Sequence, residues 1–363
     1  MNKIITVTKS FLPSKEALNK YIDRIYVTNW LTNYGSLENE LTERLKKFLN
    51  VDNLLLVNNG SLALQVLYRV LGIKNEVITT PFSFVATTST LAWEGLMPKF
   101  VDIDPSSFNL DYRLIEQNIT SNTSAILPVH VFGRACNVWE IDKIAQKYNL
   151  TVIYDAAHAF NVTTNENRNI LTYGDASILS FHATKLFHTI EGGAIIVKDE
   201  TLIKECKKLS NFGITGYDQI DGIGTNCKMN EFSAAMGLAV LDNINFIMEQ
   251  RQRVSERYNK LINPIVIPDQ VMLASVNYSY YPILLKNENQ CLKVKDNLIA
   301  NDIMPRRYFY PSLNTLNYIK YQPCPFSENI AQRILCLPMY PTLENENIEK
   351  ICNIVNHSLK PEN

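Results

Sequence analysis

Seven short apolar runs, rich in β-branched residues, lie between residues 54 and 197 of the sequence. The runs are Leu54–Val57, Val77–Thr80, Phe100–Ile103, Ala125–Val131, Thr151–Ala156, Ala176–Phe181 and Ala194–Val197. Runs that are apolar on both faces are typical of strands in a buried, mainly parallel sheet. This succession limits the fold more than any other feature of the chain.

Helical patterns separate several of these runs. The apolar residues between 63 and 71 recur at i, i+3, i+4, i+7 and i+8, and residues 138–148 show a second such pattern. Upstream, Leu37, Leu41, Leu45 and Leu49 are each four residues apart and share one helix face. Strands that alternate with helices predict an α/β domain.

The sequence changes character after residue 230. A helical stretch from Asn230 to about Ile262 begins apolar and becomes charged, as expected of a helix that leaves one core and reaches another. A Tyr-rich strand at Asn277–Leu285, a helix near Leu292–Ala300 and a final amphipathic helix around Ile348–Leu359 follow. We therefore predict an N-terminal arm and large domain over residues 1–245 and a smaller C-terminal α+β domain over 246–363.

Charge and composition exclude several classes of protein. The 35 basic and 36 acidic residues give a net charge of −1, which argues against binding to nucleic acid or to an anionic membrane through a broad basic field. No apolar run approaches a membrane span, and the first residues lack a signal-peptide pattern, so a cytoplasmic location is expected. The seven cysteines form no C-x-x-C pair and are interpreted as reduced core thiols, with no metal site.

Three local patterns carry chemistry. Asn59-Gly60-Ser61 lies between a strand and a helix, where free N–H groups and the helix dipole suit a phosphate, although alone it favours an ordinary N-cap. Asp155 ends a buried strand and needs a cationic partner there. Lys185 lies in a mostly uncharged loop, where desolvation would favour a nucleophilic amine; alone, a solvated lysine is the more usual interpretation.

The combination of these patterns is more specific than any one of them. A lysine that can form an imine, an acid for a pyridinium nitrogen and a Gly-Ser helix start together indicate pyridoxal 5′-phosphate. The chain has neither G-x-x-x-x-G-K-[ST] nor G-x-G-x-x-G, so P-loop hydrolysis and dinucleotide binding have no support.

With these motifs the sequence resembles the sugar aminotransferases of the DegT/DnrJ/EryC1/StrS family over nearly its whole length. The matching motifs are Trp30 to Gly35, Asn59 to Leu64, Pro81 to Thr87, Val101 to Asp104, Pro128 to His130, Asp155 to His158, Ser180 to Lys185, Glu191 to Gly193, and Asn226 to Glu231 with Ala234 and Ala235. The resemblance implies aspartate-aminotransferase fold type I, a mainly parallel seven-stranded sheet sandwiched by helices with a smaller C-terminal α+β domain.

The resemblance also assigns cofactor contacts. It implies that Lys185 is the catalytic, imine-forming lysine, that Asp155 pairs with the pyridinium N1 and that Phe84 stacks on the ring. Gly60, Ser61 and Ser180 match phosphate contacts, and Asn226 matches an asparagine that reaches the phosphate of the other subunit, which implies a homodimer with shared sites. His158 replaces the usual Gln beside O3′ of the cofactor. Ile190 replaces a usual Gly, and Asn161 a small residue.

The substrate follows from the resemblance as well. Lys228, Arg307, Tyr308 and Tyr310 are the candidates for sugar-nucleotide contact, with a solvated arginine pair as an equally weighted alternative for residues 306 and 307. Because Lys185 is present, transamination is favoured over dehydration. The expected reaction aminates dTDP-4-keto-6-deoxy-D-glucose with L-glutamate, as in members that form viosamine for O-antigen or another surface polysaccharide. Amination at C3, a GDP- or UDP-linked sugar, and a non-catalytic cofactor-binding sensor are the alternatives.

Overall fold

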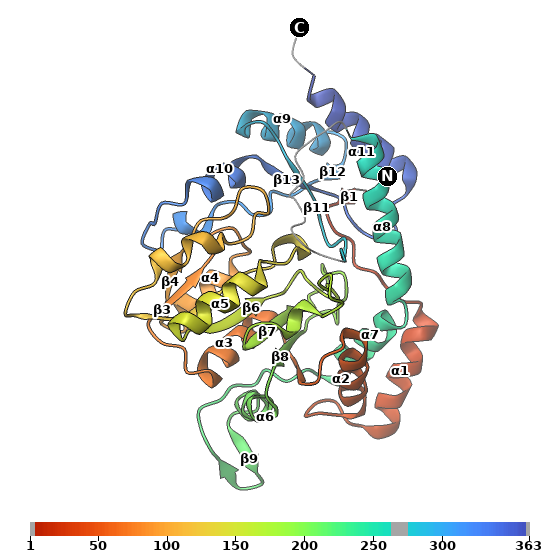
Figure 1. The fold of residues 1–363 in the computed structure, drawn as a ribbon. Coiled ribbons are helices and arrows are strands. Elements are labelled where there is room, and N and C mark those ends of the chain that lie inside the picture. The colour runs from red at the N-terminus through yellow and green to blue at the C-terminus, as the bar shows by residue number, and fades with distance from the viewer. Residues whose placement is uncertain (1–3, 263–274, 361–363) are drawn as a thin grey trace.

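The computed structural model describes residues 4–262 and 275–360. Its centre is a seven-stranded sheet in the order β2-β8-β7-β6-β5-β3-β4 (Figure 1). The strands are β2 (Leu54–Val57), β3 (Glu76–Thr79), β4 (Met97–Phe100), β5 (Thr123–Leu127), β6 (Thr151–Asp155), β7 (Ala176–Ser180) and β8 (Gly193–Val197). Only β8 runs antiparallel to its neighbours, β2 and β7. The predicted mainly parallel, seven-stranded sheet is therefore confirmed.

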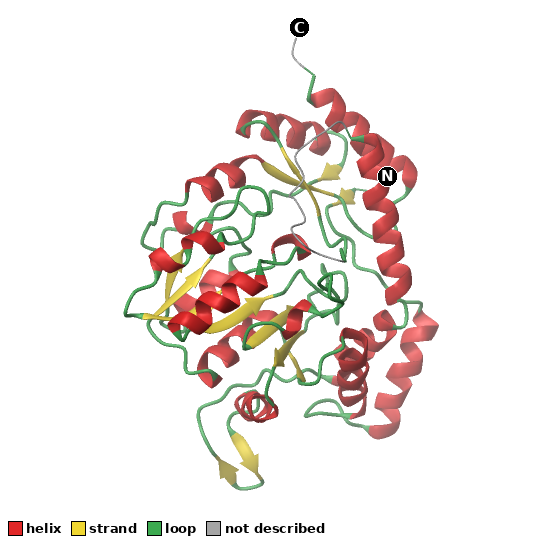
Figure 2. Cartoon of the chain, viewed as in Figure 1, coloured by secondary structure: helices red, strands yellow, loops and turns green. Residues whose placement is uncertain are grey.

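Helices cover both faces of this sheet (Figure 2). They are α1 (Lys15–Thr28), α2 (Ser36–Leu49), α3 (Gly60–Val70), α4 (Ala86–Trp93), α5 (Val138–Tyr148), α6 (Glu200–Leu209) and α7 (Glu231–Leu241). Leu54 and Leu56 of β2 join the core that contains the four leucines of α2, whereas Leu55 and Val57 join the core that contains α3. Each strand thus buries alternate side chains on opposite faces, which explains why its sequence is apolar throughout.

The third strand prediction was wrong in its position. Phe100–Ile103 was expected, but β4 spans Met97–Phe100, and Ile103 instead forms an isolated bridge with Leu110. Strand β4 is at the edge of the sheet, where an exposed Met97, a proline and a lysine are tolerated. The apolar signal came from buried residues that follow the strand.

The long helical stretch predicted from Asn230 to Ile262 is two helices. Helix α7 ends at Leu241 and α8 (Ile244–Leu261) begins after Asp242 and Asn243, residue types that compete with helical backbone bonds. Helix α7 is buried almost completely and packs against α1 and α2, whereas α8 is amphipathic. The change from apolar to charged sequence therefore marks a break between two helices.

The C-terminal lobe has its own core beside the large sheet. Its elements are β11 (Tyr281–Leu284), α9 (Glu288–Ile299), β12 (Ile303–Met304), α10 (Pro325–Arg333), β13 (Ile334–Leu337) and α11 (Asn345–Ser358). Strand β11 pairs with β13, and the N-terminal β1 (Ile5–Thr6) pairs with β12. The ends of the predicted strand and of the two predicted helices differ by one to four residues from those of β11, α9 and α11. The division at residues 245 and 246 falls in the first turn of α8 and stays a prediction.

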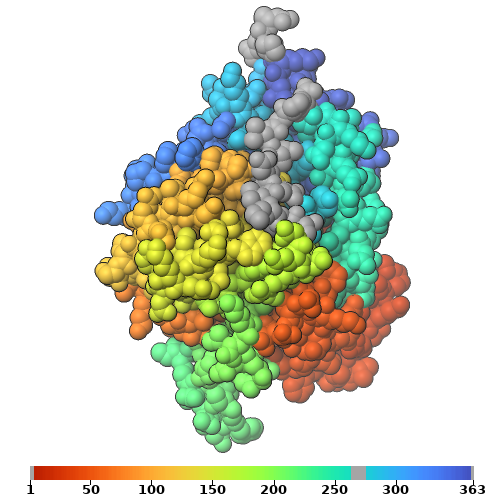
Figure 3. Space-filling view, in the orientation of Figure 1, coloured from red at the N-terminus to blue at the C-terminus, as the bar shows by residue number. Residues whose placement is uncertain are grey.

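Three further observations complete the description of the fold. All seven cysteines are buried and free. Within residues 4–262 and 275–360, no helix has both the length and the apolar character that crossing a membrane requires. A short hairpin of β9 (Ile214–Gly216) and β10 (Gln219–Ile220) projects from the molecule at the bottom of Figure 3.

Candidate active site

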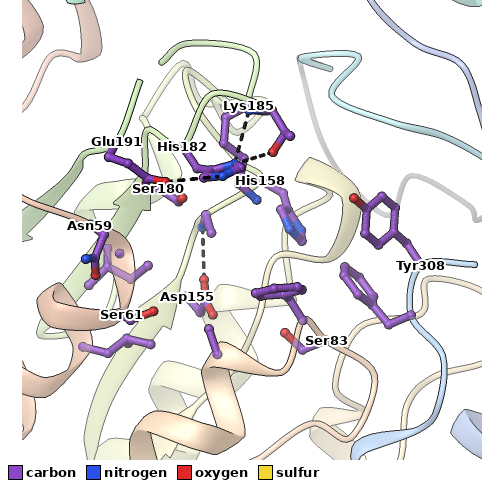
Figure 4. Close-up of a pocket in the computed structure, with 18 of the residues that line it drawn as sticks. Asn59, Ser61, Ser83, Asp155, His158, Ser180, His182, Lys185, Glu191 and Tyr308 are labelled. Carbon is purple, nitrogen blue, oxygen red and sulfur yellow. Dashed lines mark hydrogen bonds and ion pairs between the residues drawn. The ribbon is translucent and has the colours of Figure 1, made fainter. Parts of the chain in front are cut away.

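A cavity of about 690 Å³ opens at the carboxyl ends of β6 and β7, between the large sheet and the C-terminal lobe (Figure 4). We call the side that carries Asp155, His158, Lys185 and the start of α3 the inner wall. The outer wall consists of Tyr280, Arg306, Tyr308 and Phe309. The carboxyl edge of an open α/β sheet is the usual position of a ligand site, so this cavity is the candidate active site.

Asp155 is the last residue of β6 and is almost fully buried at the floor of the cavity. Its Oδ2 accepts a hydrogen bond from Thr87 Oγ1 (2.8 Å) and its Oδ1 accepts one from the Ala157 N–H (3.1 Å). Burial raises the pKa of the carboxyl above its ordinary value, while these two bonds and the charge of Lys185 oppose the rise. The carboxylate is held in place and favours a protonated partner.

Lys185 lies in the loop between β7 and β8. The base of this loop is closed by the Phe181 N–H donating to Gly192 O (2.8 Å) and the Thr189 N–H donating to Phe181 O (2.9 Å). Burial lowers the pKa of the Lys185 amine to about 8, against the attraction of Asp155. The amine is therefore easier to deprotonate than an ordinary lysine, which is what a nucleophile or a base requires.

His158 lies beside Asp155 and Lys185 on the inner wall (Figure 4). Its ring is stacked on Phe309 and lies edge-on to Tyr280, with centroids 5.5 and 4.9 Å away. Burial, helped by the charge of Lys185, lowers the pKa of the imidazole well below its ordinary value, so the ring is neutral. Its buried Nδ1 has no hydrogen-bond partner among the described residues, so the ring has unused hydrogen-bonding capacity at this wall.

The start of α3 forms a second polar group of the inner wall. Asn59 caps the helix by accepting from the Leu62 N–H (2.8 Å), so the first-turn N–H groups of Gly60 and Ser61 have no partner within the helix. A Cβ on Gly60 would lie only 3.3 Å from the Ser180 Cβ, so the ends of α3 and β7 meet closely. Free N–H groups, two hydroxyls and a helix N-terminus together suit a phosphate.

The cavity fits pyridoxal 5′-phosphate. Phe84 is 47% exposed although it is a large apolar residue, and its exposed surface lines the cavity beside Ser83. An exposed aromatic face, a buried carboxylate, an amine of low pKa and a phosphate-binding corner are the groups that hold this cofactor. The structure thus brings together Gly60, Ser61, Phe84, Asp155, His158, Ser180 and Lys185, all of which were predicted as cofactor contacts.

The predicted substrate contacts are only partly brought together. Tyr308 lines the cavity, whereas Arg307 does not, so the contact of Arg307 with a sugar nucleotide stays a prediction. The Arg307 guanidinium donates to Glu288 Oε1 (2.8 Å) and to the Gln332 carbonyl (2.6 Å), outside the cavity. The Arg307 Cζ lies 3.6 Å from the ring centroid of Tyr310, so Tyr310 packs against this guanidinium and is also outside the cavity.

Asn226 and Lys228 lie outside the cavity of their own chain as well. The Lys228 ammonium donates to Asn226 Oδ1 (2.9 Å) and to Asn211 Oδ1 (2.6 Å), and it lies over the ring of Phe212. Their predicted contacts with a phosphate or a sugar nucleotide stay predictions, and the contact of Asn226 would be made in a second subunit.

Sequence reasoning missed several lining residues. Arg306 lines the cavity in place of its neighbour, and Tyr280 enters from the segment before β11. Thr87 belongs to a quoted motif, yet nothing in the sequence pairs it with Asp155. His182 and Glu191 lie at the rim with 3.5 Å between Nε2 and Oε1. The only signal that could have suggested some of these residues was the pairing of β6 with β7, because residues at the ends of two paired strands lie close together.

Comparison with known proteins gives a consistent picture. The model of the DegT/DnrJ/EryC1/StrS aminotransferase family matches residues 13–356. A dTDP-4-amino-4,6-dideoxy-D-glucose transaminase of Shigella dysenteriae is 40% identical over 98% of this chain and 99% of its own length. A GDP-perosamine synthase of Escherichia coli O157:H7 is 31% identical over 98% of both chains. The crystal structure of DesI in the presence of its TDP-sugar product superimposes with a TM-score of 0.92 at 30% identity, covering 98% of this chain and 93% of that one.

Proposed function

The chain belongs to the DegT/DnrJ/EryC1/StrS aminotransferase family, and on this premise we propose that it aminates dTDP-4-keto-6-deoxy-D-glucose to dTDP-4-amino-4,6-dideoxy-D-glucose with L-glutamate as donor. The observation that carries the proposal is the cavity in which Asp155, His158 and Lys185 converge. The full-length 40% identity to a transaminase of this product supports the dTDP-linked 4-keto sugar over the GDP-linked one, whose relative is 31% identical. Synthesis of an O-antigen or another surface polysaccharide would use such a product.

Pyridoxal 5′-phosphate, when bound, supplies the electron sink that stabilises negative charge on the carbon losing its proton. Asp155 would hold the proton on the pyridinium nitrogen, because a buried carboxylate fixed by Thr87 and Ala157 requires a cationic partner. Neutral His158 would hydrogen-bond the O3′ oxygen. The start of α3 and Ser180 would bind the phosphate.

Lys185 has two roles in this scheme. Its amine would hold the cofactor covalently until the amino group of the donor takes its place. Because burial lowers its pKa to about 8, the released amine is a competent base near neutral pH, and it would carry the proton from Cα of the donor to C4′ of the cofactor. In the second half-reaction the same amine would carry a proton in the opposite direction, toward C4 of the sugar.

A homodimer with shared sites is part of the proposal. The β9–β10 hairpin projects from the chain and exposes Tyr217, Ile220 and nearby Ile223 (Figure 3). Exposed apolar side chains on a projecting hairpin suit contact with another chain. Asn226 and Lys228 follow this hairpin and do not reach the cavity of their own chain, as expected if they serve the second subunit.

An absorbance experiment tests the function. The purified protein, supplied with pyridoxal 5′-phosphate, should show the visible band of the lysine-bound cofactor. The band should disappear with L-glutamate and return with dTDP-4-keto-6-deoxy-D-glucose. Return only with a 3-keto, GDP-linked or UDP-linked sugar would keep the transaminase and contradict the substrate. A stable band with no formation of 2-oxoglutarate would indicate a sensor, and no band at all would overturn the proposal.

A further inference from the structure

Arg306 is a cation of the outer wall whose backbone is fixed. The Arg306 N–H donates to the Cys336 carbonyl (3.1 Å), and the Cys336 N–H donates to the Arg306 carbonyl (2.8 Å). This pair of hydrogen bonds bridges Arg306 to β13. Its guanidinium lies over the ring of Tyr308, 4.7 Å from the centroid. A planar cation on an aromatic ring, carried by a bridged backbone, is held in a defined direction.

The charges that line the cavity leave Arg306 without a counter-ion. The charged lining residues are Asp155, Lys185, Glu191 and Arg306. Both oxygens of Asp155 already accept hydrogen bonds, and Glu191 lies next to His182. No carboxylate of residues 4–262 or 275–360 lies within ion-pair distance of Arg306, whereas neighbouring Arg307 is paired with Glu288.

The position of Arg306 separates it from the proposed phosphate corner. Figure 4 shows Asn59 and Ser61 on one side of the cavity and Tyr308 on the other, with Asp155 and His158 between them. From the guanidinium, a chain of ring contacts leads through Tyr308 and Tyr280 (5.6 Å) to His158 (4.9 Å). The cation therefore lies on the side of the cavity that carries Tyr308 and His158, opposite the proposed phosphate corner.

We propose that Arg306 binds the carboxylate of the amino-acid donor. This inference rests on the proposed transaminase function, which requires such a donor. A guanidinium matches a carboxylate through two parallel hydrogen bonds. In an α-amino acid this carboxylate is bonded directly to the carbon that reacts, so it must be held close to the inner wall. In the sugar nucleotide the diphosphate is attached at C1, across the ring from the C4 ketone, and so extends farther from the reacting carbon.

The two half-reactions distinguish the donor carboxylate from the diphosphate of the sugar nucleotide, because each half-reaction uses only one of the two substrates. In the holoenzyme, Arg306→Gln should lower kcat/KM for loss of the visible band with L-glutamate by about 10- to 100-fold, the range for losing hydrogen bonds to a charged group. The return of the band with the keto-sugar, starting from the pyridoxamine-loaded protein, should change by less than about threefold. Arg307→Gln is the matched control, because its guanidinium lies outside the cavity, and it should leave the donor step within about twofold.

Binding of glutarate, a dicarboxylate without an amino group, gives a second readout that needs no turnover. Calorimetry should show affinity at least about tenfold weaker for Arg306→Gln than for the unchanged protein, and an intermediate value for Arg306→Lys, which keeps the charge and loses the planar fork. Melting temperatures of all variants report their folding.

Two results would overturn the inference. Equal glutarate affinity in Arg306→Gln would show that this side chain holds no carboxylate. A loss confined to the sugar half-reaction would assign the guanidinium to the diphosphate. If the unchanged protein transaminates no sugar nucleotide, the proposed function fails, yet the glutarate comparison still decides whether Arg306 is a carboxylate site.

Discussion

The inner and outer walls of the cavity are held in place by different means. On the inner wall, Asp155 and Ser180 end adjacent strands of the large sheet, and Lys185 follows in a loop closed at its base by backbone bonds. On the outer wall, Tyr280 and Arg306 come from the other lobe, more than 90 residues later in the chain. The inner wall is thus anchored to strand ends of the large sheet and to a loop between two of its strands, whereas the outer wall lies on loops of the second lobe.

The largest effect is expected when the reactive amine of the inner wall, that of Lys185, is removed. Lys185→Ala should abolish the visible band and lower turnover by about 1,000-fold or more, since both the covalent bond and the proton transfer are lost. Stopped-flow spectroscopy and product assay measure the two losses. Lys198→Ala, an exposed lysine beyond β8, is the control. A normal band in Lys185→Ala would show that another amine bonds the cofactor.

Asp155→Asn should come next, with turnover about 100-fold lower and the cofactor still bound, because an amide cannot hold the nitrogen proton. Thr87→Val should lower turnover by less than Asp155→Asn does, since it removes the hydrogen bond to Asp155 Oδ2 and leaves the charge of the carboxylate. Steady-state assay with bound-cofactor quantification measures both. Near-normal turnover of Asp155→Asn would mean that the carboxylate only supports the fold.

A mixing experiment asks whether the partner chain completes the phosphate corner of the inner wall. Lys185→Ala and Asn226→Ala subunits are inactive or weak alone, but a mixed dimer should contain one intact site. Random exchange should restore about a quarter of the sites of the unchanged protein. Activity is measured after exchange is proven by mass spectrometry of tagged subunits. No gain over the separate variants would contradict shared sites.

The pKa of Lys185 predicts how the apoenzyme captures its cofactor. Because the amine has a pKa of about 8, it is mostly ammonium at pH 7 and mostly neutral at pH 9. The rate of band formation after mixing apoenzyme with pyridoxal 5′-phosphate should therefore rise about tenfold between these pH values and then level off. A profile centred near the ordinary lysine pKa would show that the amine is solvated, and the contrast between the two walls would weaken.

The smallest expected effect concerns Ile190, in the loop between β7 and β8 that also carries Lys185. Ile190 has φ of 70°, a left-handed conformation that is costly for a β-branched residue. Its side chain is 49% exposed, so Ile190→Gly loses little packing and should stabilise the fold by about 1 kcal/mol. Calorimetric melting measures it. Asn161→Gly is the control, since Asn at φ of 56° is already tolerated. A lower melting temperature for Ile190→Gly would show that this side chain stabilises the loop.

The backbone at position 190 also explains why the family pattern usually has glycine there. The glycine usually found before Glu191-Gly192-Gly193 suits the positive φ at residue 190, which Ile190 adopts at a cost. Gly193 has a separate reason, because a Cβ there would lie 2.8 Å from the Gly60 backbone nitrogen at the phosphate corner. Sequence alone shows such glycines as a motif, and the close approach supplies its cause.

Much of the inner wall could be predicted because its geometry follows from the sheet. Parallel strands that end at one edge bring Asp155 and Ser180 together whatever the rest of the chain does. Strand β4 was misplaced because an edge strand needs no continuous apolar run, and the helix break was missed because only Asp242 and Asn243 separate two helical sequences.

The sequence by itself determined the sheet, the helices that cover it and the positions of Asp155 and Lys185, because periodic apolar patterns and strand ends are local features. Only the tertiary structure decided which of two adjacent arginines faces the cavity. That choice depends on the bridge from Arg306 to Cys336 and on Glu288 holding Arg307, contacts between segments distant in the chain. Once such contacts fix the backbone, two adjacent side chains lie in different environments. These contacts join distant segments, so a local sequence pattern cannot predict them.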